Sequence, residues 1–587
     1  MLKKISLLLS LSLASPFLWI LPAQASITVT TSNPGNSVTP VELTISGIPD
    51  AKNEFDPASA LLVATITRPD GTRFKVQAFW YQNFVMSTNG GVPTAMKTGE
   101  PVWKIRFAPS AAGDYQVAFE ATIDGLTIVI PNYSVRATVG TIAKVETSGV
   151  SFVRDGKPFV PIAYNIAWAN RFEEIAKYDR WFSKASASGV NVARVWMAAW
   201  SLGIEWTDTG LGDYTKRLDR AWLLDQVFQI AAKYDIGIQL VLINHGAFST
   251  STNPEWYSNP YNASNGGPIS DAGLFATDED AWKYWKQRLR YIIARYSAYS
   301  SLFTWEWWNE VNFTPIKSDD LTRWIARSDA VLTEWDPYNT LTTNSWSSGA
   351  SLQNWENLDY AVTHVYDPTD PIKSLAVQSE ALRKAVPDKP ILVGEMGSGT
   401  VTEDPFSDPT GLHLHNSQWA ATFLGFAGPA SYWWWDIYVD PLELWGHTKG
   451  LSRLTRGLDV ATMKPDRLLG IANCSTLTLS NSETTIGWIR HNNFERSAKT
   501  QLLLDAAIES LRTKKKIKTV FPDPISPGGR ISIPLKSTGN YMATFFNTLS
   551  GKEISKAKVP SNGSSAVIKV PKFTGDISFR IDKVVGS

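Results

Sequence analysis

The sequence predicts an α/β fold, namely a (β/α)8 TIM barrel flanked by an N-terminal and a C-terminal β-sandwich domain. In the middle of the chain, apolar β-rich runs alternate with amphipathic helical stretches, which is the pattern of a buried parallel sheet. Both ends of the chain show short segments of alternating polarity separated by tight turns, as β-sandwiches do. An open doubly wound sheet is the alternative for the middle, but no glycine-rich phosphate turn follows its first strand.

Residues 1–25 are predicted to be an export signal. Lys3 and Lys4 precede an apolar run that ends in the small-residue pattern Ala23-Gln24-Ala25, which predicts cleavage before Ser26. A membrane anchor is the competing interpretation, but the run is short and interrupted by serines and a proline, and no second long apolar span follows. The protein is therefore expected to be secreted or periplasmic, with no membrane span after signal removal.

Residues 26–140 and 466–587 are each expected to form a β-sandwich. Segments such as "LLVATITRP" and "VWKIRFAP" in the first region, and "TIGWIRHN" and "RISIPL" in the second, place apolar side chains on one face of a strand. Cys474 is the only cysteine, so no internal disulfide can form and packed cores must stabilise the domains.

Residues 141–460 are expected to form the barrel. Helical stretches such as "LDRAWLLDQVFQIAAKYD" and "AWKYWKQRLRYIIARYS" separate its strands. Eight strand candidates, the number that closes such a barrel, begin at Pro158, Val190, Ile236, Ser301, Asn339, Tyr360, Pro390 and Ala430. Catalytic groups in this architecture lie at the C-terminal ends of the strands.

The charge balance narrows the choice of partner. With 56 Lys and Arg against 55 Asp and Glu, the chain lacks the positive charge of a nucleic-acid-binding protein. Its 25 tryptophans offer flat faces that suit sugar rings as well as they suit a core. We therefore expect a neutral partner, an oligo- or polysaccharide, and a monomeric protein without a cofactor.

The stretch "WEWWNE" places two acids at the end of the fourth predicted strand. Glu306 and Glu310 lie on the same face of that strand, about 13 Å apart, so they cannot act on one bond together. Glu310 lies at the strand exit and can reach a substrate. Glu306 lies deep in the barrel, where it needs a cationic or hydrogen-bonding partner, so its expected role is structural.

A second carboxylate, Glu395, ends the seventh predicted strand in "ILVGEMG". Across a closed barrel it faces Glu310, and hydrolysis of a glycosidic bond requires two carboxyl groups on either side of that bond. A salt-bridged or capping glutamate is the ordinary explanation for either residue alone. The two together, each after an apolar strand, favour a catalytic pair.

Further polar and aromatic residues fall at other predicted strand exits, and they are candidate substrate-binding residues. An inward arginine would keep a nearby carboxylate ionised, as a nucleophile requires. A hydrogen bond to a loop carbonyl is an equal alternative for His245, and core packing is the default for Tyr366 and the tryptophans at 433 to 435. The candidates are Arg194, His245, Asn309, His364, Tyr366 and Trp434.

No metal is expected. The histidines show no ligand spacing with nearby acids except His413-x-His415, which is expected on a loop, either solvated or facing the substrate. Calcium near Asp404 and Asp408 has little support.

These residues resemble the retaining (β/α)8 glycoside hydrolases of clan A, the 4/7 superfamily, and especially its cellulase-like and mannanase-like branches. In that group an Asn-Glu pair ends strand four, and Asn309-Glu310 matches it. The resemblance implies that Glu310 is the general acid/base, that Glu395 is the nucleophile and that Asn309 binds the sugar 2-hydroxyl. Arg194, His364, Tyr366 and Trp434 are similar to family positions on strands two, six and eight.

The resemblance spans about Val145 to Leu454, and the N-terminal β region looks like a domain of exported bacterial members. Val311 departs from the family, where a proline is common, and this leaves the substrate open. The sequence therefore predicts an exported hydrolase that cleaves β-linked glycans with retention. The alternatives are a non-catalytic carbohydrate-binding protein and a cell-surface scaffold on the same barrel.

Overall fold

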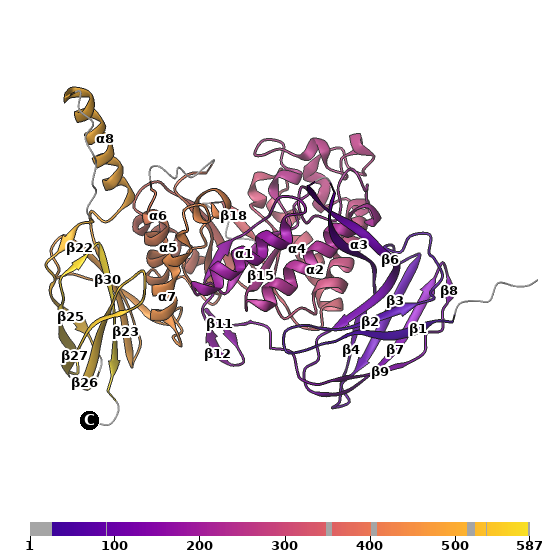
Figure 1. The fold of residues 1–587 in the computed structure, drawn as a ribbon, viewed down its shortest axis with the longest axis horizontal. Helices are drawn as coiled ribbons and strands as arrows, with labels where there is room; N and C mark the ends of the chain where they lie inside the picture. Colours follow the sequence, from indigo (N-terminus) through magenta and orange to yellow (C-terminus); the bar gives the residue numbers. More distant parts are fainter. Residues whose placement is uncertain are drawn as a thin grey trace, which may run out of the picture.

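The computed structural model describes residues 26–584 apart from 90, 348–354, 401–407, 514–522 and 536. The predicted export signal and Asp404 lie outside the described residues. None of the described helices combines the length and apolar character that a membrane span requires. In Figure 1 the first strands lie at one end of the molecule, the helices lie in the middle, and the last strands lie at the other end.

Two antiparallel sheets form the N-terminal part. One contains β1 (Thr28–Pro34), β2 (Val41–Ser46), β6 (Val92–Phe107) and β5 (Phe79–Asn89), in that order. The other contains β4 (Arg73–Gln77), β3 (Ala60–Thr67), β7 (Gly113–Ile123) and β8 (Leu126–Thr127), with β9 (Tyr133–Ala137) paired to β7. Buried residues from both sheets, such as Leu43 of β2 and Ile66 of β3, belong to one shared hydrophobic cluster. The alternating polarity of the sequence therefore creates the core between the sheets.

A ring of parallel strands forms the middle of the chain. Its members are β13 (Ala163–Asn165), β14 (Val192–Trp196), β15 (Gly237–Ile243), β16 (Leu302–Trp308), β17 (Leu341–Thr343), β18 (Ser345–Ser347), β19 (Ala361–Tyr366) and β20 (Ile391–Gly397). β13 to β17 pair in this order, and so do β18 to β20, while β17 and β18 are successive parts of one stretch with only Asn344 between them. Tyr432 bridges Met396 of β20 and Tyr164 of β13, so the pairing returns to its first strand.

The first and last predicted barrel strands differ from the structure. Residues 157–159 form β12 (Lys157–Phe159), which pairs antiparallel with β11 (Ser151–Arg154) and, through it, β10 (Glu146–Ser148). Pro161 then interrupts the strand pairing because it has no N–H to donate, and the parallel strand β13 begins only at Ala163. The run from Ala430 contributes single bridges at Tyr432, and a helical turn follows at Trp435–Val439.

Helices surround the parallel strands (Figure 1). They are α1 (Glu174–Ala187), α2 (Leu218–Lys233), α3 (Glu279–Tyr296), α4 (Ser318–Trp335), α5 (Pro371–Ala385), α6 (Leu412–Phe423) and α7 (Thr448–Thr455). In α3 the side chains of Trp285, Leu289 and Ile292 are buried at helical spacing, and Asp278 caps the first turn by accepting from the amide of Ala281. These buried side chains belong to the same hydrophobic cluster as Trp305 and Trp307 of β16.

The C-terminal part returns to antiparallel strands. Its largest sheet contains β21 (Lys464–Leu468), β22 (Cys474–Ser480), β23 (Thr484–His491), β30 (Asp576–Lys583), β26 (Thr538–Phe546) and β27 (Glu553–Asn562). Two further pairs are β24 (Ile525–Ser526) with β29 (Phe573–Thr574), and β25 (Gly529–Pro534) with β28 (Ser565–Val570). The helix α8 (Arg496–Thr513) was not predicted, and it extends away from the strands in Figure 1.

A buried ionic cluster joins the N-terminal strands to the helices. Asp225 of α2 accepts from Arg106 of β6 at 2.6 Å and from Arg295 of α3 at 2.6 Å, and all three side chains are buried. Replacing Asp225 by asparagine leaves the buried Arg295 guanidinium without a carboxylate partner, while Arg106 keeps Glu42 at 2.7 Å. We therefore expect a loss of about 3–5 kcal/mol of unfolding free energy in denaturant titrations.

The matched control is Asp114→Asn, which removes the exposed pair with Arg136 at 3.3 Å. An exposed pair contributes about 0–1 kcal/mol, so this variant should unfold close to the wild type. Equal unfolding midpoints for the two variants would show that the buried cluster does not stabilise the junction.

Candidate active site

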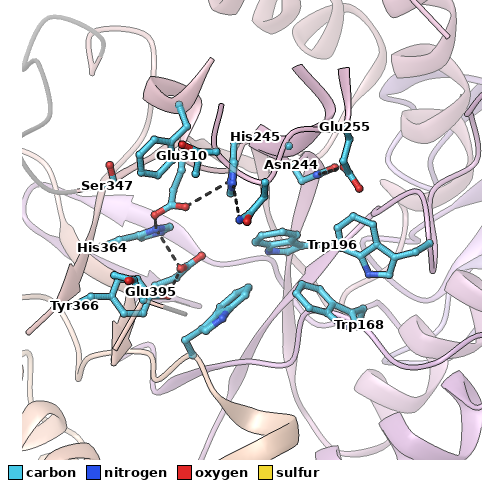
Figure 2. A pocket seen from close by; sticks show the side chains of 17 residues that line it. Trp168, Trp196, Asn244, His245, Glu255, Glu310, Ser347, His364, Tyr366 and Glu395 are labelled. Atoms are coloured by element: carbon cyan, nitrogen blue, oxygen red, sulfur yellow. Dashed lines mark hydrogen bonds and ion pairs between the residues drawn. The ribbon is translucent and has the colours of Figure 1, made fainter. Parts of the chain in front are cut away.

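A cavity of about 560 Å³ opens where the parallel strands end. Its wall contains residues from the C-terminal ends of several strands and from the loops that follow them, as Figure 2 shows. The wall contains Glu310, His364, Tyr366 and Glu395, and it also contains a group of indoles from Trp168, Trp196, Trp200 and Trp433 that contact one another. Acids and imidazoles together with indole faces provide both a reactive centre and a surface for an apolar ring face.

Glu310 follows the buried strand β16 in a strained backbone conformation. Its φ of 45° and ψ of 49° lie in the left-handed region, which residues other than glycine rarely adopt. The Ser345 hydroxyl accepts from the Glu310 amide at 3.1 Å and holds this turn. The turn directs the Glu310 carboxyl group into the cavity instead of along the sheet.

Glu395 lies within β20 and accepts two strong hydrogen bonds. Arg194 donates to Glu395 Oε1 at 2.6 Å, and the Tyr366 hydroxyl donates to Oε2 at 2.5 Å. A cation and a hydroxyl donor both favour the ionised form of a carboxyl group.

His364 lies between the two acids. Its Nδ1 is 2.9 Å from Glu310 Oε1 and 3.4 Å from Glu395 Oε2, as the dashed lines in Figure 2 indicate. The nearest polar atoms of the three side chains all lie within 4.8 Å of one another. The two carboxyl groups therefore meet at close to the separation of about 5–5.5 Å found in glycosidases that retain configuration.

The surroundings give the two acids different properties. Burial raises the pKa of Glu310 and of Glu395, and the charge of Glu310 raises the pKa of Glu395 further. Arg194 and the Tyr366 hydroxyl oppose that shift at Glu395. Burial lowers the pKa of His364 to about 4, so this imidazole is neutral near pH 7. Of the pair, Glu395 has the donors that a carboxylate needs, and Glu310 is the better place for a shared proton.

Glu306 has the partner that its burial requires. Arg194 donates to both oxygens of Glu306 at 2.7 Å, and Gln239 donates to Oε2 at 2.7 Å. Although burial alone would raise the pKa of Glu306, Arg194 holds it below its usual value. Arg194 therefore links the deep acid to Glu395 and fixes the position of both.

Asn309 and His245 form a second chain of contacts behind Glu310. Asn309 accepts from Arg194 at 2.7 Å, so its amide nitrogen faces His245 Nδ1 at 2.9 Å. Burial lowers the pKa of His245, which suits a neutral ring that accepts at Nδ1. The same Nδ1 is 3.6 Å from Glu310 Oε2. His245 thus contacts side chains of the site, and Asn253 lies near its other ring nitrogen at 3.4 Å.

The predicted substrate-binding residues fall into two groups. His245, His364 and Tyr366 line the cavity. Arg194 and Asn309 do not, because their polar groups are engaged with other side chains behind the wall. The prediction of Trp434 is wrong in register, since Trp433 lines the cavity and the Trp434 indole donates to the Gly399 carbonyl at 3.1 Å.

Sequence reasoning also missed part of the wall. Trp168 and Trp196 come from the exits of β13 and β14, and Trp168 contacts Trp196, Trp200 and Trp433 with ring centroids 5.3 to 5.6 Å apart. The strand-exit rule that selected Arg194 applies to Trp196 as well. Glu255, on the loop after β15, had no signal in the sequence.

The expectation of a loop at His413 and His415 is wrong. Both residues are buried in α6, which begins earlier than the sequence suggested because Asp408 accepts from the amides of Leu412 and His413. His415 contacts Asp576 of the C-terminal sheet at 2.8 Å. These residues stabilise the fold and lie outside the cavity, and Asp408 serves as a helix cap.

Within the described residues, the side chains that could together hold a metal ion are Glu310, His364 and Glu395. The Arg194 guanidinium already lies 2.6 Å from Glu395 and supplies a positive charge there. A divalent cation at this position would be repelled by that charge. The donor set therefore fits an acid pair better than a metal centre.

Curated relatives resemble the chain in sequence. It is 23% identical over 232 residues to mannan endo-1,4-beta-mannosidase F of Aspergillus clavatus, covering 38% of this chain and 51% of that protein. It is 24% identical over 304 residues to mannan endo-1,4-beta-mannosidase 2 of Arabidopsis thaliana, covering 48% and 61%. These relatives confirm the predicted resemblance to cellulase-like and mannanase-like glycoside hydrolases. The chain spans about half the length of the first curated relatives it matches.

Solved structures show the same fold. A candidate glycoside hydrolase from Bacteroides vulgatus has a TM-score of 0.57 and 14% identity, with 93% of this chain and 99% of that chain covered. At that identity the likeness concerns the fold alone. No family model matches the chain.

Proposed function

We propose that this chain is an exported glycoside hydrolase that cleaves a β-linked glycan with retention of configuration. The observation that carries the proposal is the close approach of Glu310 and Glu395, whose nearest polar atoms lie within 4.8 Å of each other. Of these two acids, Glu395 is the one that accepts hydrogen bonds from Arg194 and Tyr366. A separation of this size leaves no room for a water molecule between a carboxylate and the sugar, so direct attack by the carboxylate is favoured over inversion.

Glu395 is the nucleophile in the proposed reaction, and Glu310 is the acid and then the base. Glu395 attacks the anomeric carbon while Glu310 protonates the departing glycosidic oxygen, which gives a glycosyl ester on Glu395. Water then attacks the same carbon, Glu310 takes its proton, and the Glu395 carboxylate leaves. His364 contacts Glu310 Oε1 at 2.9 Å and can hold that oxygen in place through both steps.

We further propose that the ring of parallel strands is a (β/α)8 barrel, residues 141–460, with β-sandwich domains at 26–140 and 466–587 and an export signal at 1–25. The circuit of strand pairings and the helix between most successive strands support the barrel. The two antiparallel sheets on one core support the first sandwich.

Substrate screening tests the activity. The curated relatives are named as mannan endo-1,4-beta-mannosidases, so β-mannan is the first substrate to try, beside β-glucan, xylan and aryl β-glycosides. We expect new reducing ends from at least one substrate with wild-type protein, and a rate on the same polysaccharide about 10³-fold lower with Glu310→Gln. Binding without cleavage of every substrate would favour the non-catalytic alternative.

Because no metal takes part in the proposed reaction, prior treatment with EDTA should leave the rate unchanged.

The Tyr366→Phe variant should change the pH dependence. Burial raises the pKa of Glu395 and the Tyr366 hydroxyl opposes the shift, so removing the hydroxyl raises this pKa further. Glu395 must be ionised to act as the nucleophile, and this ionised form is lost as pH falls through its pKa. The acidic limb of the kcat/KM profile should therefore move to higher pH. An unmoved limb would indicate that Tyr366 does not tune Glu395.

A further inference from the structure

A third carboxyl group, Glu255, lines the same cavity away from the two reacting acids. It follows β15 on a loop, and Figure 2 shows it beside Asn244 on the part of the wall opposite Tyr366. Among the described residues its side-chain hydrogen-bond partner is the Asn244 amide, which donates to Oε2 at 2.9 Å. Oε1 is thus available to a ligand in the cavity.

The loop holds Glu255 in a fixed position. The Glu255 amide donates to the Gly246 carbonyl at 2.8 Å, and a Cβ at position 246 would lie 2.6 Å from the Asn253 carbonyl and 3.1 Å from Glu255 Oε2. Glycine is therefore required for this close approach. The next residue, Trp256, anchors the loop by packing on Phe248 with ring centroids 5.8 Å apart. A carboxylate held in this way needs little reorganisation on binding.

The charges on the wall are of one sign. Three carboxyl groups face the cavity, those of Glu255, Glu310 and Glu395, and its other described lining residues include neither lysine nor arginine. Burial lowers the pKa of both lining imidazoles, so they add little positive charge near pH 7. A sugar hydroxyl can donate to such a carboxylate, whereas a sugar carboxylate is repelled by it.

We propose that Glu255 is a specificity-determining residue that accepts hydrogen bonds from hydroxyl groups of a neutral sugar unit and rejects uronic acid units. This inference rests on the proposed glycoside hydrolase function. The Asn244 amide fixes one oxygen of Glu255, and the other accepts from the sugar while the apolar face of a ring lies on the indole wall. The substrate class is accordingly a neutral β-linked glycan.

Two matched substrate pairs test the proposal. Cellohexaose and the β-1,4-glucuronan hexamer differ only in a carboxylate at C6, and so do β-1,4-mannohexaose and the β-1,4-mannuronan hexamer. Wild-type protein should favour the neutral member of the pair that it accepts. Glu255→Gln should raise KM for the neutral member about tenfold with kcat nearly kept, and should shrink the preference over the acidic member by about tenfold.

Glu173→Gln is the matched control, because Glu173 also accepts from an asparagine amide, that of Asn170 at 3.1 Å, but lies outside the cavity wall. It should behave as the wild type. The preference of the wild type should also weaken with added salt, since screening reduces repulsion. A Glu255→Gln protein with the wild-type KM and the wild-type preference would overturn the proposal.

Calorimetry separates this inference from the proposed function. Neutral and acidic hexamers are titrated into Glu310→Gln and into Glu310→Gln with Glu255→Gln, so turnover is not needed. Absence of hydrolysis by the wild type contradicts the proposed function, yet weaker neutral binding and a smaller preference in the double variant still support Glu255 as the recognition residue. Equal affinities in the two proteins contradict the inference even when the wild type is active.

Discussion

Replacing Glu395 by glutamine is expected to lower kcat on every substrate by on the order of 10⁵-fold. The amide cannot attack the anomeric carbon, so the glycosyl ester does not form. The loss should be the same for good and poor leaving groups, because the first bond-making step fails in both. The rate is measured with a polysaccharide and with an activated aryl β-glycoside.

The fold should survive this change, which keeps the effect interpretable. Arg194 retains both hydrogen bonds to Glu306 at 2.7 Å, so its charge stays paired in the Glu395→Gln protein. Thermal unfolding of the variant should stay within a few degrees of the wild type. A Glu395→Gln protein that keeps more than about a tenth of the wild-type kcat on either substrate would rule out its role as nucleophile.

Replacing Glu310 by glutamine should give a loss that depends on the leaving group. Protonation of a sugar leaving group by a positioned acid contributes about 10²–10⁴-fold, whereas a good phenolate leaving group needs no proton. We therefore expect kcat on a polysaccharide to fall by about 10³-fold, and formation of the glycosyl ester from an activated aryl glycoside to change little. Burst kinetics with the aryl substrate measure that first step separately.

Hydrolysis of the ester also uses Glu310, as the base, so the ester should accumulate in the Glu310→Gln protein. A small anionic nucleophile such as azide needs no base, and its addition should restore turnover of the aryl substrate as a β-glycosyl azide forms. Equal losses on both substrates, without rescue by azide, would contradict the assignment of Glu310 as acid and base.

The regular elements of the middle region could be predicted because their signals are local. The apolar runs at β14, β15, β16, β19 and β20 have the length and composition of buried parallel strands, and the helices between them show an apolar stripe. The need of Glu306 for a cationic partner followed from its burial alone. Its identity as Arg194 depends on the register across β15, where Arg194 pairs with Gln239, and that register is a tertiary property.

The errors arose where the backbone leaves a regular period. A choice among Trp433, Trp434 and Trp435 by alternation assumes an extended strand, but a helical turn begins at Trp435, directly after the bridge at Tyr432. The direction in which each indole side chain points then depends on the geometry of that turn. In the same way the start of α6 depends on the side chain of Asp408, four residues before the helix, and local hydrophobic spacing carries no information about that cap.

The Glu255 position shows the other limit. Its loop contains short helical turns, Trp256–Ser258 and Ala263–Asn265, whose arrangement depends on Gly246 and on packing against Phe248. Neither the hydrophobic periodicity nor the composition of this loop distinguishes Glu255 from any exposed acid. The three-dimensional contacts alone bring it to the cavity.

Covalent labelling tests the central claim most directly. The reagent is a 2-deoxy-2-fluoro-β-glycosyl fluoride of the preferred sugar. Its fluorine at C2 slows both steps, and its anomeric fluoride is a good leaving group, so the glycosyl ester should accumulate. Intact mass spectrometry of the wild type should show the addition of one fluoroglycosyl group, and peptide mapping should place it on Glu395, with loss of activity in step with labelling. Turnover of substrates by a protein that takes up no label, or a label on any residue other than Glu395, would contradict the account.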